Sequence, residues 1–290
     1  MTAATEREVL LAYKAALKDL RLQLATLYEK YSVNGVLSYA DMAKYNRLNS
    51  MIGGMTETLK ATTKNTSKAI LQANKKIFER SYYHNAFLIE KTAQVKLAFG
   101  VLNPKVVQAS VENPIAGLTL SETLQTNRLA IITKIKQELT QGVIKGEPYS
   151  RIAKRIATVL GNDAAKANRV VRTEAHRNSN QAHLDSMDHA ASHGVKTKKM
   201  WVATLDDRTR DTHADLDGQT VEMDEDFRSS SGARGQGPGL FGDPAEDINC
   251  RCEMITVIEG YEPTERRAGK EVVPYTTYKE WAKEKGLPED

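Results

Sequence analysis

The sequence is short of cysteine, proline and aromatic residues, and the cysteine count alone excludes one class of protein. Its 290 residues include 2 Cys, 8 Pro and 6% aromatic residues. Two cysteines cannot form the disulfide framework of a small secreted protein, and Cys250 and Cys252 lie too close in sequence to bridge each other easily. They are therefore free thiols, metal ligands or partners in an intermolecular pair.

Long apolar runs and targeting signals are also missing. No run approaches the roughly 20 apolar residues that a helix needs to cross a bilayer. The first thirty residues lack the layout of a signal peptide, and no GxxxxGK[ST] phosphate loop of a motor ATPase occurs. We expect a protein with no membrane partner, kept in the cytoplasm or carried inside a particle that is assembled there.

Charge is unevenly distributed along the chain. Residues 1–165 hold 23 Lys and Arg against 13 Asp and Glu, a net charge of +10, whereas residues 166–290 hold 18 against 24, a net charge of −6. A basic first half is typical of proteins that lie near an anionic partner such as nucleic acid. An ordinary solvated helical surface also accounts for it, because Lys is a good helix former.

Helical periodicity dominates the first two thirds of the chain. Apolar residues spaced by four and three predict a helix over 5–31, with a seam that pairs with another helix or with another copy of the chain. The short length of the seam favours packing within the chain. The seam comprises Tyr13, Leu17, Leu20, Leu24, Leu27 and Tyr31. A second helix is expected from Ser38. In the Thr- and Lys-rich stretch 61–68 it is expected either to break or to lie exposed, and helix resumes to about residue 99.

Further helices follow a turn-rich connector at 100–118, which has room for one short helix. Thr119 and Glu122 form a capping-box pattern that begins a helix ending near residue 142. Two more helices are expected over 148–161 and 162–193, separated by Gly161.

After Gly194 the apolar period changes from helical to strand-like. Alternation predicts strands over 195–202, 219–223 and 253–258, and the glycine-rich stretch 228–242 is expected to be a loop or disordered. The fold class is thus α+β: a long, mostly helical N-terminal region, then a small mixed α/β C-terminal domain and an extended tail.

Three domains are expected. Residues 1–118 form a helical region with the coiled-coil-like seam. Residues 119–258 form a second domain, with helices at 119–193 and a small α+β part at 195–258, and residues 259–290 form a polar tail with a short helix near 278–285.

Residues 200–252 carry most of the chemically distinctive side chains. His213, Cys250 and Cys252 are ligand types that zinc prefers, and zinc usually takes four ligands. Alternatively, the two cysteines are small buried residues on one side of a strand. The candidates for a fourth ligand are His176, His183, Asp206 and Asp217. Another pair, His189 and His193, has helical spacing for a metal but is more simply explained as exposed.

Two other interpretations of this stretch stay open. A cysteine nucleophile with His213 and an Asp matches the residue types, although neither cysteine begins a helix that would lower its pKa. An ADP-ribosyl transferase of the Arg/Ser/Glu type has only a scattered Arg and Glu in its favour. In the structural interpretation, bidentate Arg–carboxylate pairs fix the turns of a small domain. Its members are Asp206, Arg208, Arg210 and Asp217, with Gly218 in a left-handed turn.

Taken in order, several short motifs over residues 120–258 resemble the phage Mu protein F-like family. Two helix elements come first, at Leu124–Arg128 and Leu139–Gly142. The motifs that follow are Arg172-Thr173-Glu174, then Trp201, then Asp206, Arg208, Thr209, Arg210, His213, Leu216, Asp217 and Gly218, and finally Asn249-Cys250-Arg251-Cys252. The family often has a proline-rich segment before the last motif, where this chain has a Gly/Ser-rich loop.

The resemblance implies a minor head, or head morphogenesis, protein of a tailed double-stranded DNA phage. Such a protein would associate with the portal inside the head and act in procapsid assembly, DNA packaging, retention or ejection. Packaged DNA, the scaffold and the major capsid protein are further candidate partners, and the expected location is the virion, with host cytoplasm during assembly.

No catalytic residue and no enzymatic activity follow from the resemblance. Some relatives carry toxin domains beyond this module, and we expect too few residues after Cys252 to hold one. The alternative function is a metal- or cysteine-dependent enzyme carried in the phage head.

Overall fold

A computed structural model describes residues 1–114, 118–204, 206–268 and 271–285. The chain folds as two compact units, both discontinuous in sequence. Unit 1 comprises Met1–Ala73 and Leu118–Arg172, and unit 2 comprises Asn74–Gly117 and Thr173–Asp290. Two long helices, α3 and α6, contribute residues to both units. The three segments expected from the sequence as domains stay a prediction.

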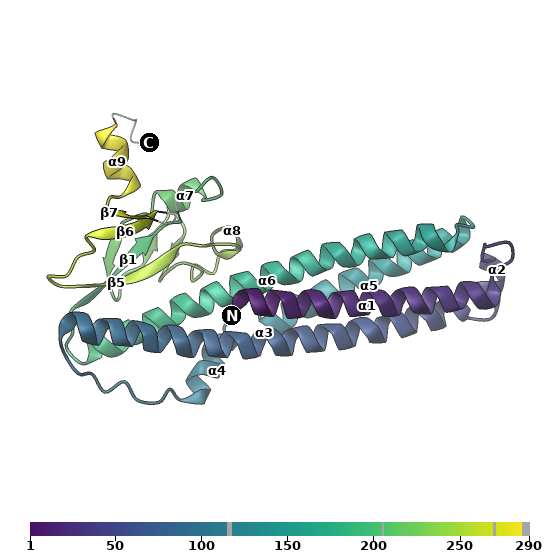
Figure 1. The fold of residues 1–290 in the computed structure, drawn as a ribbon, viewed down its shortest axis with the longest axis horizontal. Coiled ribbons are helices and arrows are strands. Elements are labelled where there is room, and N and C mark those ends of the chain that lie inside the picture. Colours follow the sequence, from purple (N-terminus) through teal and green to yellow (C-terminus); the bar gives the residue numbers. More distant parts are fainter. Residues whose placement is uncertain (115–117, 205, 269–270, 286–290) are drawn as a thin grey trace. The chain divides into compact units, whose positions relative to one another are not determined.

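Unit 1 is a bundle of long helices. It contains α1 (Thr2–Tyr31), the short α2 (Tyr39–Lys44), the first part of α3 (Arg47–Ala93), α5 (Leu120–Ile144) and the first part of α6 (Tyr149–Ser192). The long helices α1, α3, α5 and α6 run side by side in Figure 1, and α2 lies in the connection between α1 and α3. Leu20 and Leu24 of the predicted seam are fully buried, in one core cluster with Met55, Ile135 and Ile156. The seam therefore packs within the chain, as expected.

The expected interruption of α3 at 61–68 is wrong, because the helix is continuous from Arg47 to Ala93. Thr62 and Thr63 donate hydroxyl hydrogen bonds to backbone carbonyls one turn earlier, each at 2.9 Å. Leu59 and Ile70 continue the buried face on either side. Packing of this face outweighs the low helix propensity of threonine.

The expected boundary at Gly161 is also wrong, because α6 is one helix from Tyr149 to Ser192. Gly161 does not adopt the left-handed φ of a helix-ending glycine. Leu160 and Ala164 are buried on either side of it. A long helix is read as two when a single glycine is taken as a stop signal, although glycine costs only about 1 kcal/mol relative to alanine.

The predicted helix-capping signals are confirmed, although the helix that begins after Ser38 is shorter than expected. Ser38 caps α2 by accepting a hydrogen bond from the Asp41 amide, and Thr119 and Glu122 form the predicted capping box of α5. However, α2 ends at Lys44, and α3 begins after Asn46, whose φ of +52° breaks the helix.

Unit 2 contains the rest of α3 and α6 and a small antiparallel sheet. Its other helices are α4 (Pro104–Glu112), α7 (Asp211–Ala214), α8 (Pro244–Asp247) and α9 (Tyr278–Glu284). The sheet has the order β2-β1-β5, with β1 (Thr197–Val202) between β2 (Thr220–Glu222) and β5 (Glu253–Ile258). These strands and α9 match the predicted positions closely, and the α+β class is confirmed.

Two hairpins of unit 2 were not expected. The stretch predicted to be loop or disordered contains β3 (Phe227–Arg228) paired with β4 (Arg234–Gly235), and the predicted extended tail contains β6 (Glu265–Ala268) paired with β7 (Glu271–Pro274). Strands this short leave too few alternating residues for a period to be read.

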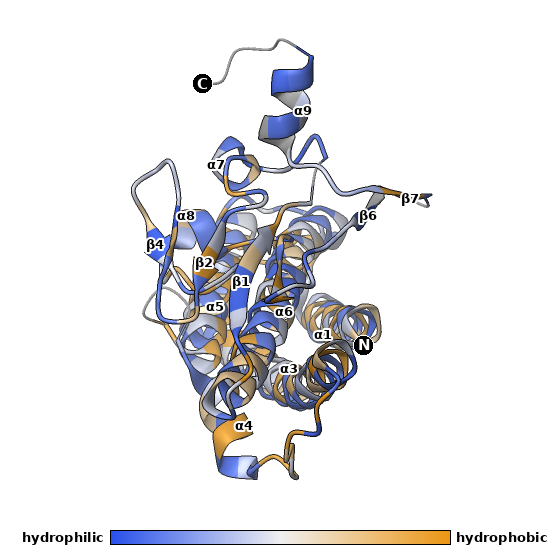
Figure 2. Ribbon diagram, turned by 90° about the vertical axis from the view of Figure 1, so that its left-hand side faces the viewer, coloured by the Kyte–Doolittle hydropathy of each residue, from blue (hydrophilic) through white to orange (hydrophobic). Residues whose placement is uncertain are grey.

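The core of unit 2 forms around Trp201 on β1. Trp201 is fully buried and contacts Phe227 and Phe241 edge-on, with ring centroids 5.5 and 5.8 Å apart. Figure 2 shows hydrophobic and hydrophilic residues mixed along the long helices, as amphipathic packing requires. Within the described ranges, none of the helices combines the length and apolar character of a membrane span.

Candidate functional site

The structure brings His213, Cys250 and Cys252 together in unit 2. His213 lies on α7, and both cysteines lie in the segment between α8 and β5. The Nδ1 atom of His213 is 3.6 Å from the Sγ of Cys250 and 3.5 Å from the Sγ of Cys252. All three side chains are buried, with exposed fractions of 2%, 4% and 2% respectively. The cluster therefore offers one imidazole nitrogen and two sulfur atoms to the same small volume.

Glu246 on α8 determines which nitrogen of His213 faces the sulfur atoms. Its Oε2 atom is 2.8 Å from His213 Nε2, and both side chains are buried. A carboxylate can only accept a hydrogen bond, so Nε2 carries the proton and donates it. In neutral histidine the other nitrogen, Nδ1, then has a free lone pair directed at the two cysteines.

Hydrogen bonds hold the Glu246 carboxylate in place. Ser229 and Ser231 donate to Oε1 at 3.2 and 2.6 Å, and Thr212 donates to Oε2 at 3.3 Å. Burial raises the pKa of Glu246, but the hydrogen bonds from Ser231 and His213 outweigh it and lower the pKa below its usual value. The carboxylate is thus ionised at neutral pH, and it links α7 and α8 to the loop that contains Ser229 and Ser231.

The backbone that carries the two cysteines is fixed by other motif residues. Asn249 adopts a φ of +59°, and its amide donates to the Thr173 hydroxyl at 3.2 Å. The Arg251 guanidinium forms a bidentate pair with Asp206, with both N···O distances 2.5 Å. The Thr204 hydroxyl donates to the Arg251 carbonyl at 2.7 Å. Both thiols are buried in this segment, whereas the Arg251 side chain pairs with Asp206 and is partly exposed.

Arg210 and Trp201 place His213. Arg210 donates to the backbone carbonyls of Glu246, at 3.5 Å, and of Ile248, and so ties the start of α7 to α8. The rings of Trp201 and His213 pack edge to face, with centroids 5.3 Å apart. The imidazole is therefore held by packing as well as by its hydrogen bond to Glu246.

The predicted candidates for a fourth ligand do not join the cluster. His176 bonds to Asn180 and to the Cys252 backbone, and His183 bonds to the Met254 carbonyl. Asp206 pairs with Arg251, as described. Within the residues that the structure covers, the cluster of potential metal ligands consists of His213, Cys250 and Cys252.

Asp217 forms an Arg–carboxylate pair that fixes a turn, as the structural interpretation predicts. Its partner, however, is Arg266, which lies outside the motif. Asp217 accepts a hydrogen bond from the Ala203 amide at 2.8 Å and pairs with Arg266 at 2.8 Å. Gly218 has a φ of +79°, and a Cβ there would lie 2.2 Å from a methyl carbon of Thr277. This turn therefore requires glycine both for its conformation and for space.

The remaining motif residues are distributed between the two units. Arg172 pairs with Glu6 at 2.7 Å in unit 1. Glu174 is buried with Arg177 at 3.3 Å in unit 2, and burial raises its pKa despite this arginine. Leu216 is buried in the core around Trp201. Arg208 lies 3.6 Å from Asp206, and the Thr209 hydroxyl donates to the Thr204 carbonyl.

Sequence reasoning missed Glu246 and the serines that bond to it. Glu246 lies four residues before Cys250 in a short segment after Asp243-Pro244, a position in which an acidic residue is normally explained by the start of a helix. Its contact with His213 spans 33 residues of sequence. No local pattern marks such a contact.

A cysteine nucleophile is poorly supported by this geometry. Hydrogen bonding with Cys250 and His213 lowers the pKa of the Cys252 thiol, which favours the thiolate. However, both thiols are almost completely buried, so a substrate cannot approach them. The other histidine pair, His189 and His193, stacks ring on ring at 4.3 Å and lies outside the cluster.

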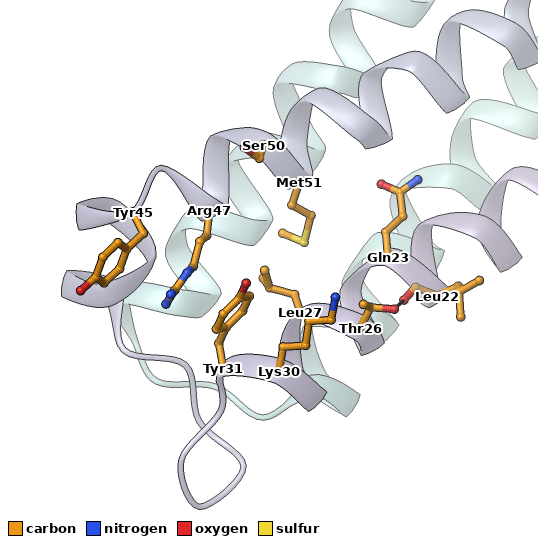
Figure 3. A pocket seen from close by; sticks show the side chains of 10 residues that line it. All are labelled: Leu22, Gln23, Thr26, Leu27, Lys30, Tyr31, Tyr45, Arg47, Ser50 and Met51. Carbon is orange, nitrogen blue, oxygen red and sulfur yellow. Dashed lines mark hydrogen bonds between the residues drawn. The ribbon is translucent and has the colours of Figure 1, made fainter.

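A second feature lies in unit 1, where α1, the start of α3 and Tyr45, which follows α2, line an open groove of about 510 Å³ (Figure 3). Arg47 lies between the rings of Tyr31 and Tyr45, with its guanidinium carbon 3.8 and 4.3 Å from their centroids. Leu27 and Met51 line the groove beside them.

Comparison with known proteins places the chain among phage head proteins. A family model described as "Phage Mu protein F like protein" matches residues 133–255. Minor head protein GP7 of Bacillus phage SPP1 is 37% identical over 278 residues, which are 94% of this chain and 90% of that protein.

Two further relatives have lower identity than GP7, and the match covers a smaller share of their length. NAD(+)–arginine ADP-ribosyltransferase EFV of Enterococcus faecalis is 29% identical over 279 residues, and this chain spans 56% of its length. An uncharacterized protein of Haemophilus influenzae is 28% identical over 141 residues, 49% of this chain and 28% of that protein. No solved structure gives a significant match. Since a minor head protein matches along nearly its whole length and the family model matches the region of the motifs, the chain belongs to the phage Mu protein F-like family of minor head proteins.

Proposed function

We propose that this protein binds the portal inside the phage head and acts in procapsid assembly and in the packaging, retention or ejection of DNA. The observation that carries the proposal is the match to minor head protein GP7, which covers 94% of this chain and 90% of that protein. A relative that aligns over both units supports a shared role for the whole chain.

The groove of unit 1 is the surface through which we propose this association. It is lined by Tyr31, Tyr45 and Arg47, residue types that often dominate the energy of protein interfaces. Stacking on two rings already orders the Arg47 side chain, which reduces the entropy lost on binding. Leu22 at its edge is 63% exposed and adds apolar surface that a partner would bury.

Co-purification tests the association. The full chain is co-expressed with the portal protein of the same phage, and the tagged portal is expected to retain it. In parallel, heads assembled with and without portal are analysed for the chain, which should be missing from portal-free shells. Failure to bind isolated portal, together with equal incorporation into portal-free shells, would overturn the proposal.

Paired variants then locate the contact. Arg47→Ala changes a half-buried residue of the groove and Tyr45→Ala an exposed one, and each should weaken retention by the portal about tenfold or more. Tyr83→Ala changes an aromatic residue of similar type in unit 2 and should leave retention unchanged. Equal effects of all three variants would place the contact elsewhere on the chain.

An enzyme carried in the head is the alternative function, and the similarity to ADP-ribosyltransferase EFV is the observation in its favour. That similarity covers about half of the transferase. We expect no transfer of ADP-ribose from NAD⁺ to an arginine substrate by this chain. Transfer that requires His213 or Cys250, in a variant that still folds and enters heads, would favour the enzyme.

A further inference from the structure

We propose that His213, Cys250 and Cys252 bind one zinc ion, with Glu246 as the residue that orients the histidine. The inference is independent of the portal association, because it concerns side chains within unit 2. The ligand types are those of structural and catalytic zinc sites, in which thiolate sulfur and imidazole nitrogen predominate.

The distances between the ligand atoms match a tetrahedral ion. Zinc bound at about 2.3 Å from sulfur and about 2.0–2.1 Å from nitrogen separates tetrahedral sulfur and nitrogen ligands by about 3.6 Å. The observed separations of His213 Nδ1 from the two Sγ atoms are 3.6 and 3.5 Å. All three ligand atoms lie within 4.8 Å of one another. The two nitrogen–sulfur separations are therefore those of a tetrahedral zinc site.

Glu246 supplies the contact that metal-bound histidines usually make. A zinc-binding imidazole commonly donates its other N–H to a carboxylate, which fixes the tautomer and increases the basicity of the ligand nitrogen. Here Nε2 donates to Glu246 at 2.8 Å and Nδ1 faces the thiols. The carboxylate is itself held by Ser229 and Ser231, so the orienting residue is preorganised.

The ion would join three segments of unit 2 that have little regular structure. His213 lies in a helix of four residues, the cysteines follow another helix of four residues, and Glu246 connects both to the loop at Ser229 and Ser231. Because the ligands are brought together only in the folded chain, metal binding contributes directly to folding stability. Among the described residues the cluster offers three side-chain ligands, which leaves one position of a tetrahedral ion without a side-chain ligand.

The first experiment measures metal in the purified full chain by elemental mass spectrometry. We expect about one zinc per chain and a melting temperature that falls on chelation and recovers with added Zn²⁺ but not with Mg²⁺, which avoids sulfur ligands. Replacement by Co²⁺ should produce thiolate-to-cobalt charge-transfer bands and the d–d bands of a tetrahedral site. A metal-free chain whose melting temperature and spectrum do not respond to either ion would overturn the proposal.

Variants assign the ligands. Cys250→Ser, Cys252→Ser and His213→Gln should each lose bound zinc, whereas His193→Gln, on an exposed histidine outside the cluster, should retain it. Since a ligand variant can fail to fold, His213→Cys serves as a second test, because it keeps a zinc ligand and should shift the cobalt bands toward those of three thiolates. Retention of zinc by all three ligand-removal variants would contradict the assignment.

The role of Glu246 has its own readout. Glu246→Gln retains the shape of the side chain but removes the charge, and it should lower zinc affinity about 10–100-fold in competition with a chelator. Glu259→Gln, an exposed glutamate of the same unit, is the matched control and should leave the affinity unchanged. Equal affinities of the two variants would remove Glu246 from the site while leaving the three ligands in place.

Discussion

At the residue scale, the pair of Tyr13 and Asp163 in unit 1 shows how a contact between distant segments changes the role of a side chain. Asp163 follows Gly161-Asn162 and was expected to lie at a helix start. Instead it lies inside α6 and accepts a hydrogen bond from the Tyr13 hydroxyl at 2.7 Å. Burial raises the pKa of Asp163, although Tyr13, Lys166 and Lys134 act in the opposite direction.

The raised pKa predicts a stability change with pH. The folded state holds the Asp163 proton more tightly than the unfolded state, so this residue favours folding below its ordinary pKa, and the contribution is lost as pH rises through the raised value. Asp163→Asn mimics the neutral form and retains an acceptor for Tyr13. We expect the variant to be more stable than the parent protein at pH 7, with an advantage that disappears near pH 3, measured by urea unfolding.

Tyr13→Phe is the companion measurement. It leaves the buried carboxylate without this donor and should destabilise the protein by about 1–3 kcal/mol at pH 7. For Asp163→Asn, a loss of stability that is the same at pH 7 and near pH 3 would show that burial does not disfavour the charged form of Asp163.

At the element scale, the two longest helices tolerate residues of low helix propensity, because the buried faces of these helices continue past them. Thr62 and Thr66 are buried in α3, and Gly161 lies between buried residues of α6. In contrast, Gly142 near the end of α5 is required by close packing. A Cβ there would lie 2.5 Å from the Ile152 side chain on α6 and 2.9 Å from Arg155.

This contrast predicts opposite effects for two glycine substitutions. Gly53→Ala lies on an exposed part of α3, where the new methyl group meets no described atom within 4 Å beyond its chain neighbours and the adjacent backbone of its own helix. It should stabilise the protein by about 0.5–1 kcal/mol. Gly142→Ala should destabilise it by about 1–3 kcal/mol through overpacking. Thermal and denaturant unfolding of both variants check the pair, and equal signs would disprove the packing argument.

At the scale of the whole molecule, charge divides between the two units. Unit 1 carries 20 Lys and Arg and 10 Asp and Glu, a net charge of +10, whereas unit 2 carries 21 and 27, a net charge of −6. The sequence alone places the excess of positive charge in the first half, and the fold collects it in one compact unit. A concentrated positive charge suits contact with packaged DNA.

We therefore expect the full chain to bind double-stranded DNA with little sequence preference and with an affinity that falls steeply as salt increases. Removing two exposed charges of unit 1, with Lys134→Gln and Lys136→Gln together, should weaken binding and lower the salt dependence. The control is Lys196→Gln with Lys198→Gln in unit 2, where both lysines already pair with glutamates. A binding isotherm that does not change between low and high salt would exclude an electrostatic contact with DNA.

The sequence by itself determined the features that depend on neighbours along the chain. The period of apolar residues predicted α1 and its buried seam, Thr119 and Glu122 predicted the capping box of α5, and alternation located β1 and β5. The resemblance carried by Asn249-Cys250-Arg251-Cys252 and the preceding motifs is confirmed by the match to a minor head protein. These features are local because capping and periodicity act over one or two turns.

Only the tertiary structure decided which distant residues meet. It brought His213 to both cysteines, placed Glu246 behind the histidine, paired Asp217 with Arg266, and let α3 and α6 continue through residues that locally favour a break. Such contacts join segments tens of residues apart, and many sequences with similar local patterns would pair them differently. Burial and hydrogen bonding of the whole unit select one arrangement, so neither the cluster of His213 with the two cysteines nor the continuity of the helices can be derived from local sequence alone.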